Sequence, residues 1–513
     1  MMRHKRIVSC LALASSLHAF PALGITLEEA TYTAIENSPT VRQALAEYRE
    51  GIENTEISRR GGLYPSIDVA AGLGHETTYD YQDSGDDVGL TRRELSLSLT
   101  QPIFDGFMSK YDAQRLSEET EANRWGALIA VENTALDVAE AYANVLRFRE
   151  LVDLANINQQ THERIYEQIK LKSNSGVGRQ SDLSQITARL AKANANRLSA
   201  INNLQDAEST YKNVVGEMPP EDMIYPVPDR DLIPTSLDEA IADAMRSNPA
   251  IEAARWDVKA TESFLNATDS NKYPEVNFLL ERTFNNNIDG DRGPSEDLTA
   301  MFRVTYNIYN GDNDKRRKEV AVQQNVQASE IQRNTARETE LSVRLAWSAY
   351  EASLGSKDYL REYVIATKES QVAYDRQFRL GRRTLLDVLD SENELFTARQ
   401  DYVNADYDEL FSEFRLFNAK GELMRAFRIY RPPVLGFADA FEDDEMPRRG
   451  ASAIDELKQA ETQIESPVET SEEPQQSATS TTPAQTPSPS ESDNTTSEED
   501  SLFLDATEEG RTW

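Results

Sequence analysis

Two aspartates, Asp387 and Asp390, are the residues of this sequence with the clearest capacity for chemistry. Side chains three positions apart project from the same face of a helix, so the two carboxylates lie together if this segment is helical. Repeated around a narrow symmetry axis, such carboxylates would form a ring that passes or traps cations and resists full ionisation through like-charge repulsion. On an isolated helix the same pair would only be part of a solvated face.

The other residue types argue against catalysis and against a bound cofactor. The chain has 4 histidines and 1 cysteine, too few to favour a dedicated transition-metal site. We find no nucleophile beside a base, no cluster of metal ligands and no phosphate-binding loop, so the sequence predicts neither an enzyme nor a metal or cofactor site. A formal net charge of −34 also predicts that the chain repels nucleic acid rather than binding it.

The N-terminus has the pattern of an export signal. Residues 1–6 carry three basic side chains, residues 7–17 are mostly apolar, and residues 22–24 place small side chains at a cleavage site. The apolar stretch is too short to span a bilayer, so we predict a Sec signal peptide over residues 1–24, with a retained membrane anchor as the alternative. Cys10 lies inside this peptide, and the exported chain is therefore expected to carry no thiol and no lipid anchor.

Four short motifs occur twice, in the same order, at offsets of 210, 209, 205 and 203 residues. The pairs are residues 26–39 with 236–249, 64–65 with 273–274, 103–106 with 308–311, and 178–181 with 381–384. One such pair could arise by chance, but four in order indicate a duplication. The sequence therefore predicts a tandem repeat of one unit.

Each unit opens with a helix start, in which Thr26 or Ser236 precedes acidic residues. We predict a single helix that ends near residues 64–65 in the first unit and near 273–274 in the second. Two strands follow each helix, at 67–73 and 95–100 and then at 276–280 and 298–308. The last of these alternates apolar with polar residues, as a strand with one apolar and one wet face does. A soluble β-sandwich would show the same alternation, so this pattern favours a membrane barrel only weakly.

Long segments without proline follow each strand pair, over residues 103–218 and 295–431. Both are rich in residues that favour helix. From Gly106 to Gly178, and again from Gly311 to Gly381, a continuous helix would extend ~105 Å. The shorter stretches that follow, 181–215 and 384–426, are predicted to return antiparallel to them. Helices of this length imply packed helical hairpins in an elongated body.

Four strands cannot close a barrel, and an open sheet edge is not stable in lipid. Several chains would therefore have to share one barrel, and three would give twelve strands, an even number within the bacterial range. Rotational symmetry then makes a central pore natural. A periplasmic coiled-coil protein with small soluble β modules is the alternative that the pattern leaves open.

The whole layout resembles the TolC-like outer-membrane factor family over about residues 26–426. The matching motifs lie at residues 101–106, 306–311, 345–347 and 381–395, and are most similar to the branch that serves type I secretion. The resemblance implies a mixed α+β membrane protein that forms a homotrimer, with a 12-stranded barrel in the outer membrane of a Gram-negative bacterium. It also implies a long antiparallel α-helical periplasmic tunnel, closed at its inner tip until an inner-membrane ABC transporter and a periplasmic adaptor (membrane fusion protein) open it.

The resemblance further implies roles for particular residues at the hairpin tips. It assigns Asp387 and Asp390 to the tunnel constriction. It makes Arg383 a gate latch that ties neighbouring hairpins together through an aspartate corresponding to Asp182, beside Ser181.

Two further features of the tips follow from the same resemblance and from the repeat. Family members often carry tyrosine where this chain has Phe378, so one latch hydrogen bond is expected to be missing. Gly178 and Gly381 are expected to form the turns of the two hairpins.

These observations predict five parts: a signal peptide (1–24), a first repeat (25–219), a linker (220–235), a second repeat (236–430) and an acidic Ser/Thr/Pro-rich tail (431–513). From residue 437 onward the tail has 20 acidic and 4 basic residues, a composition that predicts disorder. It would act as a solvating extension, or bind an adaptor or the cell wall through residues 502–504.

The predicted function is a channel-tunnel, with porin activity rather than enzymatic activity, for type I protein secretion. Its partners would be the outer-membrane lipid, the adaptor, the transporter and an exported protein cargo that the sequence does not identify. Small-molecule efflux is the first alternative, and a structural coiled-coil protein is the distant one.

Overall fold

The computed structural model describes residues 25–80, 82, 85–429, 431–437, 448–451, 455–459 and 461. The description that follows concerns Met1–Glu465, the first of the two units into which the chain divides. The predicted signal peptide, 1–24, and the part of the predicted tail from 462 onward lie outside the described residues.

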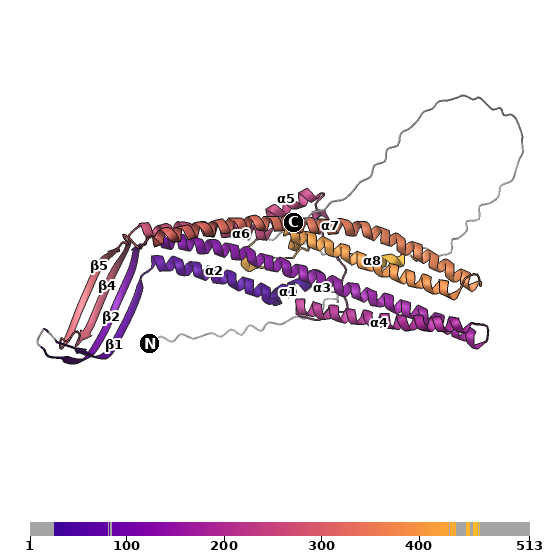
Figure 1. Ribbon diagram of the computed structural model, residues 1–513, viewed down its shortest axis with the longest axis horizontal. Coiled ribbons are helices and arrows are strands. Elements are labelled where there is room, and N and C mark those ends of the chain that lie inside the picture. The colour runs from indigo at the N-terminus through magenta and orange to yellow at the C-terminus, as the bar shows by residue number, and fades with distance from the viewer. Residues whose placement is uncertain are drawn as a thin grey trace, which may run out of the picture. The chain divides into compact units, whose positions relative to one another are not determined.

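Two successive sets of elements follow the same order of helices, strand pair and helical hairpin (Figure 1). The first set comprises α1 (Leu27–Asn37), α2 (Pro39–Leu63), β1 (Ser66–Thr78), β2 (Val88–Phe104), α3 (Met108–Asn174) and α4 (Gln180–Val215). The second set comprises α5 (Leu237–Ser247), α6 (Pro249–Ala267), β4 (Glu275–Asn286), β5 (Pro294–Thr305), α7 (Asn313–Arg379) and α8 (Leu385–Lys420), and α9 (Leu423–Ala426) follows it. Helices α3 and α7 each have 67 residues, and α4 and α8 each have 36. This equality supports the predicted tandem repeat.

The opening helix of each set is interrupted, where the sequence predicted one continuous helix. Ser38 ends α1 and caps α2, and Asn248 does the same between α5 and α6. A proline follows each of them, at the first position of the next helix. Because proline has no N–H and disfavours helical geometry in the residue before it, the chain turns at both places and starts a new helix.

The four long strands form one antiparallel sheet in the order β1-β2-β4-β5. The predicted strands are therefore confirmed, although β1, β2 and β4 extend well beyond the predicted ranges. The fourth strand is an exception, because β5 ends at Thr305 and not at the predicted residue 308. The sheet lies at one end of the first unit and the hairpin tips lie at the other (Figure 1).

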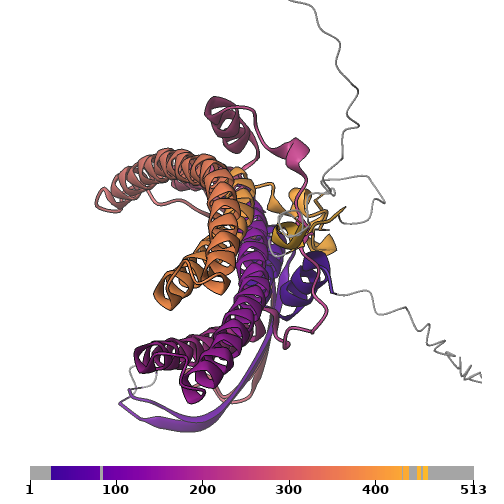
Figure 2. The same ribbon diagram turned by 90° about the vertical axis from the view of Figure 1, so that its right-hand side faces the viewer.

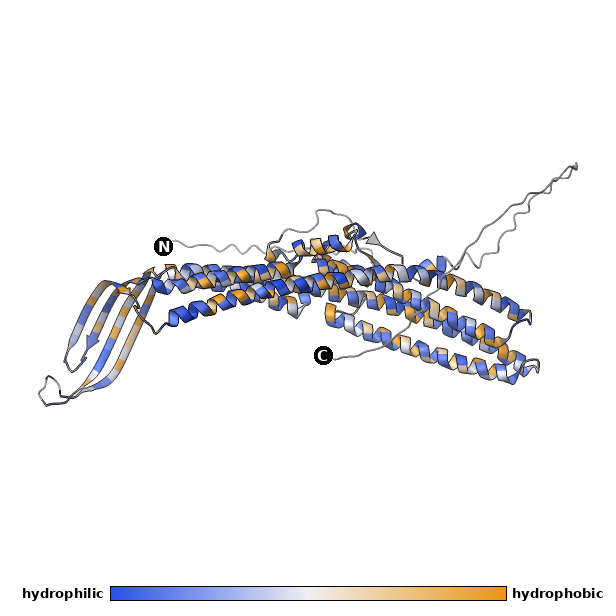
Figure 3. Cartoon of the chain, turned by 45° about the horizontal axis from the view of Figure 1, so that its top comes forward, coloured by the Kyte–Doolittle hydropathy of each residue, from blue (hydrophilic) through white to orange (hydrophobic). Residues whose placement is uncertain are grey.

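One face of this sheet is apolar and is not covered by the described part of the chain. Its exposed side chains include Ile67, Val69 and Leu73 of β1, and Leu298, Phe302 and Val304 of β5, all more than 60% exposed. The register carries the same face across β2 and β4, since Leu97 pairs with Val69 and Leu99 with Leu280. Figure 3 shows that hydrophobic and hydrophilic residues mix along these strands. A soluble sandwich would bury such a face against a second sheet.

None of the described helices is long and apolar enough to cross a membrane.

The main core lies where the two hairpins meet, around the middle of α3 and along α8. Helix α3 packs against α2, α4, α6 and α8, and α8 packs against α7 as well as α3. The largest fully buried side chains of this core come mainly from α3 and α8, among them Tyr142, Tyr402, Phe414 and Phe417. Figure 2, which looks toward the hairpin tips, shows the α3/α4 and α7/α8 hairpins next to each other.

The predicted linker, 220–235, is an ordered strap across the core. It contains β3 (Pro226–Val227) and the 3-10 helix η2 (Arg230–Leu232). The hydroxyl of Tyr142 accepts the N–H of Ile224 at 2.9 Å and lies 2.7 Å from the carbonyl oxygen of Ile25. The strap therefore fastens the start of the first repeat to the core.

The disorder predicted from residue 431 onward does not hold for the first part of the tail. Leu435, in the 3-10 helix η4 (Pro433–Leu435), is 1% exposed, and Leu457 is 4% exposed in the same core. The short strand β6 (Arg448–Arg449) pairs with β3, and Tyr402 donates a hydrogen bond to Glu456 at 2.8 Å. A few apolar anchors thus fix short stretches of a tail whose average composition predicts disorder, among them residues 431–437 and 455–459.

Candidate functional site at the hairpin tips

Both hairpins turn through loops of equal length, 175–179 between α3 and α4 and 380–384 between α7 and α8. In each loop a glycine follows the helix C-cap with φ of +75°, Gly176 in the first and Gly381 in the second. Its N–H returns to the preceding turn, from Gly176 to Ser173 at 3.1 Å and from Gly381 to Phe378 at 2.9 Å. These left-handed positions favour glycine because the Cβ of any other residue causes steric strain there.

The helix ends correct the predicted pairing of the two tips. When the helix ends of the two repeats are matched, Gly176 and not Gly178 is equivalent to Gly381, and Asp182 is equivalent to Asp387. The offset is 205 residues in both cases (381 − 176 and 387 − 182). Gly178 is needed for another reason, because a Cβ on it would lie 2.8 Å from the backbone nitrogen of Ser173. The sequence match at 178–181 was therefore two residues out of register with the structure.

Asp387 closes the N-terminus of α8. Its carboxylate accepts the backbone N–H of Thr384 at 3.0 Å and the Thr384 hydroxyl at 2.8 Å, while the Thr384 hydroxyl accepts the N–H of Asp387 at 3.4 Å. The backbone N–H and the hydroxyl of Thr384 hold the pKa of Asp387 below its usual range. Asp387 therefore stays ionised within the single chain and forms a capping box that the Thr-x-x-Asp spacing could have revealed.

Asp390 has a different partner, which the sequence did not suggest. Its carboxylate accepts a hydrogen bond from Arg189 of α4 at 2.7 Å, so this ion pair joins the second hairpin to the first. The two residues are separated by 201 positions, and no local pattern connects them. The structure thus places the two predicted constriction aspartates on successive turns of α8 but gives them separate roles.

Arg383, the predicted latch, lies within its own hairpin. It donates to Gln377 at 3.1 Å, its guanidinium lies 4.5 Å from the ring centre of Tyr374, and it approaches Asp387 to 3.8 Å. On the other tip, Asp182 accepts a hydrogen bond from Ser181 at 3.3 Å. A link between Arg383 and Asp182 of neighbouring chains stays a prediction.

Phe378, where the resemblance predicts a missing latch hydroxyl, packs between the two tips. It is half-buried against an apolar cluster that joins the two tips, whose buried members are Ile169, Ile186, Leu385 and Leu389. The ammonium of Lys172 lies 5.2 Å from the centre of its ring, a cation–π contact from the first hairpin to the second. Phe378 thus contributes apolar contact across the tips in the place of a hydroxyl.

A buried charged network joins α8 to α7, its partner in the second hairpin, and to the strap. Asp406 and Glu409 of α8 pair with Lys357 of α7 at 2.5 and 2.8 Å, and Glu413 pairs with Arg230 of the strap at 3.0 Å. Glu413 is fully buried, and desolvation raises its pKa to about 7 in spite of Arg230. The spacing of three and four residues marks one face of α8, but the sequence did not show that this face would be buried.

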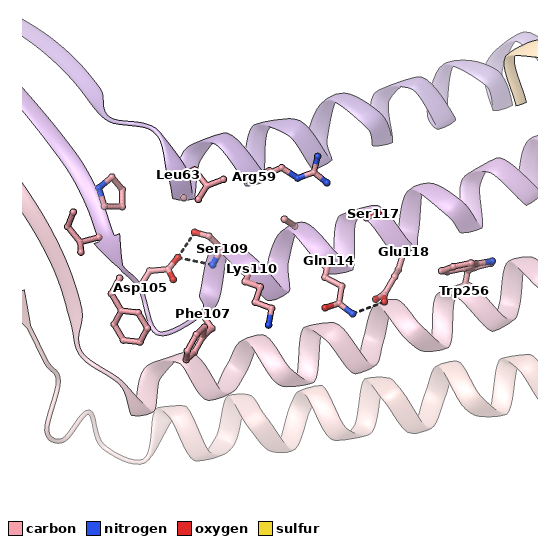
Figure 4. A pocket seen from close by; sticks show the side chains of 15 residues that line it. Arg59, Leu63, Asp105, Phe107, Ser109, Lys110, Gln114, Ser117, Glu118 and Trp256 are labelled. Carbon is pink, nitrogen blue, oxygen red and sulfur yellow. Dashed lines mark hydrogen bonds between the residues drawn. The ribbon is translucent and has the colours of Figure 1, made fainter. Parts of the chain in front are cut away.

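A cleft of about 720 Å³ lies at the junction of the sheet and the helices (Figure 4). Its walls combine apolar side chains, such as Leu63 and Phe107, with the polar groups of Lys110 and Glu118. Asp105 in this cleft accepts the N–H of Ser109 at 2.8 Å and so helps to start α3. Among the described residues no group of three or more His, Cys, Asp or Glu side chains could hold a metal ion.

Comparison with known proteins agrees with this arrangement of sheet and hairpins. The pattern of the family described as outer membrane efflux protein matches residues 30–217 and 240–422, one block in each repeat. The chain therefore belongs to the outer membrane efflux protein family, whose members include the TolC proteins. It is accordingly an outer-membrane protein of a Gram-negative bacterium with a large periplasmic portion.

Three relatives indicate the range of this family. The chain is 25% identical to the outer membrane efflux protein BepC of Brucella suis, over 82% of this chain and 91% of BepC. It is 25% identical to the outer membrane protein TolC of Escherichia coli, over 75% of this chain and 80% of TolC. It is 22% identical to the alkaline protease secretion protein AprF of Pseudomonas aeruginosa, over 77% of this chain and 84% of AprF.

Solved structures share the fold. The Campylobacter jejuni CmeC outer membrane channel superposes with a TM-score of 0.68 at 14% identity, over 85% of this chain and 89% of CmeC.

Proposed function

We propose that the chain acts as a homotrimeric duct through the outer membrane and the periplasm. The observation that carries this proposal is the uncovered apolar face of the sheet, whose outer strands β1 and β5 each have one unpaired edge in the single chain. Three copies would pair β5 of one chain with β1 of the next and close a barrel of twelve strands. The apolar face would then contact lipid, and the 67-residue helices would continue the barrel as a tunnel.

At the inner end of this tunnel, Asp387 and Asp390 form the proposed constriction. Arg383 of one chain and Asp182 of a neighbour form the proposed latch, and gating, not catalysis, is the chemistry of the site. Arg383→Ala is expected to raise the conductance of single channels in planar lipid bilayers, because the closed state loses a charge-assisted link. The wild-type channel, measured in parallel, is the control. If the variant and the wild type have the same conductance, the latch assignment is wrong.

For cargo, we propose type I protein secretion with an ABC transporter and a periplasmic adaptor. The motif around residues 381–395 supports this, and the relative AprF is a secretion protein by name. Small-molecule efflux is the second candidate, because BepC is an efflux protein by name and is the more similar of the two.

A clean deletion strain, compared with its parent and with the deletion complemented in trans, distinguishes the two candidates. Both the secreted proteome and the sensitivity to dyes and detergents are measured. Loss of one or a few large secreted proteins with unchanged sensitivity would support secretion and name the cargo. Normal secretion with raised sensitivity would favour efflux. If the purified protein gave neither heat-resistant trimers nor ion conductance, a structural coiled-coil role would replace both.

A further inference from the structure

We infer that the cleft at the junction of the sheet and the helices binds an anionic phospholipid of the membrane leaflet that faces the periplasm. The phosphate would lie near Lys110, and the acyl chains would lie against the apolar walls of the cleft. This inference rests on the proposed function, because it requires that the sheet forms part of a barrel in the outer membrane. It goes further by assigning a ligand class to a cleft that a duct alone does not need.

The walls of the cleft continue the apolar face of the sheet. Phe104, at the end of β2, lines the cleft and pairs with Val276 of β4, which shares the apolar face with Leu280 because strand side chains alternate. The ring centre of Phe104 lies 5.2 Å from that of Phe107, a second wall residue. Leu63, at the end of α2, is a third and is 65% exposed. Apolar surface therefore extends from the sheet into the cleft and offers acyl chains a continuous contact.

The basic groups of the cleft come from two helices. Arg59 lies on α2 and Lys110 on α3 (Figure 4). Lys110 forms no ion pair with any residue that the structure describes, and its ammonium lies 5.3 Å from the ring centre of Tyr111. Arg59 pairs with Glu56 of its own helix at 2.5 Å, which leaves other N–H groups of the guanidinium available. A phosphate in the cleft would therefore meet a lysine that lacks a counter-charge.

The two acidic residues of the cleft already have other partners. Asp105 accepts hydrogen bonds from the backbone N–H and the hydroxyl of Ser109. Glu118 accepts a hydrogen bond from the hydroxyl of Ser263 of α6 at 2.5 Å. Neither carboxylate pairs with Lys110, although the chain as a whole carries a formal net charge of −34. Charge complementarity thus favours an anionic headgroup over a neutral apolar ligand.

The second repeat places basic residues at the same depth. Lys315 follows Gly311 by four positions, as Lys110 follows Gly106, an offset of 205 residues in both cases (315 − 110 and 311 − 106). Residues 316–317 are both arginine, and none of residues 315–317 forms an ion pair in the described part of the chain. Cations in the first turn oppose the helix dipole, so the stability of α7 does not explain them. In the proposed barrel both lysines would lie at the level of the lipid phosphates.

The test measures how many phospholipids stay bound to the full-length protein, purified in dodecyl maltoside with added phosphatidylglycerol, by native mass spectrometry. We expect Lys110→Gln to weaken retention about fivefold, the contribution of one basic side chain beside a lipid headgroup. Lys192→Gln is the matched control, because Lys192 is an exposed lysine without an ion pair among the described residues and lies on α4, away from the sheet (Figure 1). It should match the wild type.

A second pair of variants tests the apolar wall without changing charge. Leu63→Ser should also weaken retention, because the acyl chains lose a contact surface. Leu171→Ser is its control, since Leu171 is 68% exposed near the end of α3 that is distant from the sheet. Both side chains are largely exposed, so neither substitution should disturb the fold.

Two further ligands identify the source of the phosphate. We expect stronger retention of phosphatidylglycerol than of phosphatidylethanolamine, and no more displacement by inorganic phosphate than by chloride at equal ionic strength. Equal retention of the two lipids, specific displacement by inorganic phosphate, or Lys110→Gln behaving like Lys192→Gln would overturn the inference. A protein that gives neither heat-resistant trimers nor ion conductance would instead overturn the proposed function, so the two failures are distinguishable.

Discussion

The two hairpins have the same lengths but are stabilised differently. Helix α8 is buried along most of its length, whereas α4 buries only scattered residues such as Ile186 and Tyr211 among those described. Conversely, α3 has an extended buried stretch through its middle that α7 lacks. Across the repeats α3 packs against α6 and α8, neither of which is its equivalent element.

This difference shows what a duplication preserves and what it changes. The repeat preserves the backbone plan, because helix lengths and turn positions coincide at an offset of 205 residues at the tips. It does not preserve the environment, because α3 and α8 face the core while α4 and α7 present more of their surface outward. Equivalent positions are therefore free to diverge, and substitutions at paired positions measure how far they have done so.

The largest expected difference lies at the turns after the strands, at Gly106 and Gly311. Both have positive φ, +69° and +73°, but a Cβ on Gly106 would lie 2.4 Å from the carbonyl oxygen of Ser270, whereas a Cβ on Gly311 would meet nothing within 4 Å. Gly106→Ala should therefore destabilise the fold by about 3 kcal/mol or more, by backbone strain and steric overlap. Gly311→Ala should cost only about 1 kcal/mol, the cost of the left-handed conformation.

Thermal unfolding of the two purified variants in detergent measures this difference. The wild type and an alanine substitution at Gly355, a helical glycine with open space around it, serve as references. Equal destabilisation by Gly106→Ala and Gly311→Ala would contradict the single-chain comparison and would indicate that Gly311 is packed against another copy in the assembly.

The next expected effect concerns a buried carboxyl in each half, Glu132 of α3 and Glu413 of α8. Desolvation raises the pKa of both to about 7. The folded state then binds more protons than the unfolded state between about pH 4.5 and 7, so stability falls as the pH rises through this window. Glu132 accepts the N–H of Leu423 at 3.1 Å, whereas Glu413 pairs with Arg230 at 3.0 Å.

Glu132→Gln should therefore remove part of the loss of stability between pH 6 and pH 8, by about 1–2 kcal/mol at pH 8. Glu413→Gln should give a smaller gain, because Arg230 loses one of its carboxylate partners. Melting temperatures of the wild type and both variants at pH 6 and pH 8 provide the measurement. Variants that lose as much stability between pH 6 and pH 8 as the wild type would contradict the protonation of these carboxyls in the fold.

The sequence predicted those features that short local patterns encode. All four strands were located, the last of them by its alternation of apolar and polar residues, and the absence of proline located the long helices. The same local reading failed where a single residue carried the signal. Pro39 and Pro249 divide the opening helices, although each stood inside a motif already noted.

Features that depend on distant partners were not accessible in this way. Arg189 and Asp390 belong to different repeats, and nothing in either segment points to the other. Leu435 and Leu457 order part of an acidic tail because both side chains are buried in the core. An average over the composition of the tail cannot show this. The predicted pairing of Gly178 with Gly381 was wrong because a shift of two residues changes little in a sequence match. In the structure, however, the positive φ that matches Gly381 belongs to Gly176.

The smallest expected difference lies at the two tips themselves. Thr384 caps α8 through its hydroxyl, whereas Arg179, the N-cap residue of α4, makes no capping hydrogen bond through its side chain. Thr384→Ala should therefore cost about 1 kcal/mol, the usual loss for such a cap, and should act locally on the first turns of α8. Ser181→Ala, which removes the hydroxyl near the matching start of α4, should cost a few tenths of a kcal/mol at most, because its bond to Asp182 is long, at 3.3 Å.

Hydrogen exchange of the peptides covering residues 380–395 and 175–190 measures both effects in the same sample. We expect Thr384→Ala to exchange faster in residues 380–395 and not in 175–190, and Ser181→Ala to leave both peptides nearly unchanged. Equal acceleration of both tips in that variant would mean that the tips open as one unit, so that a single cap holds both hairpins and the apparent difference between them is only local.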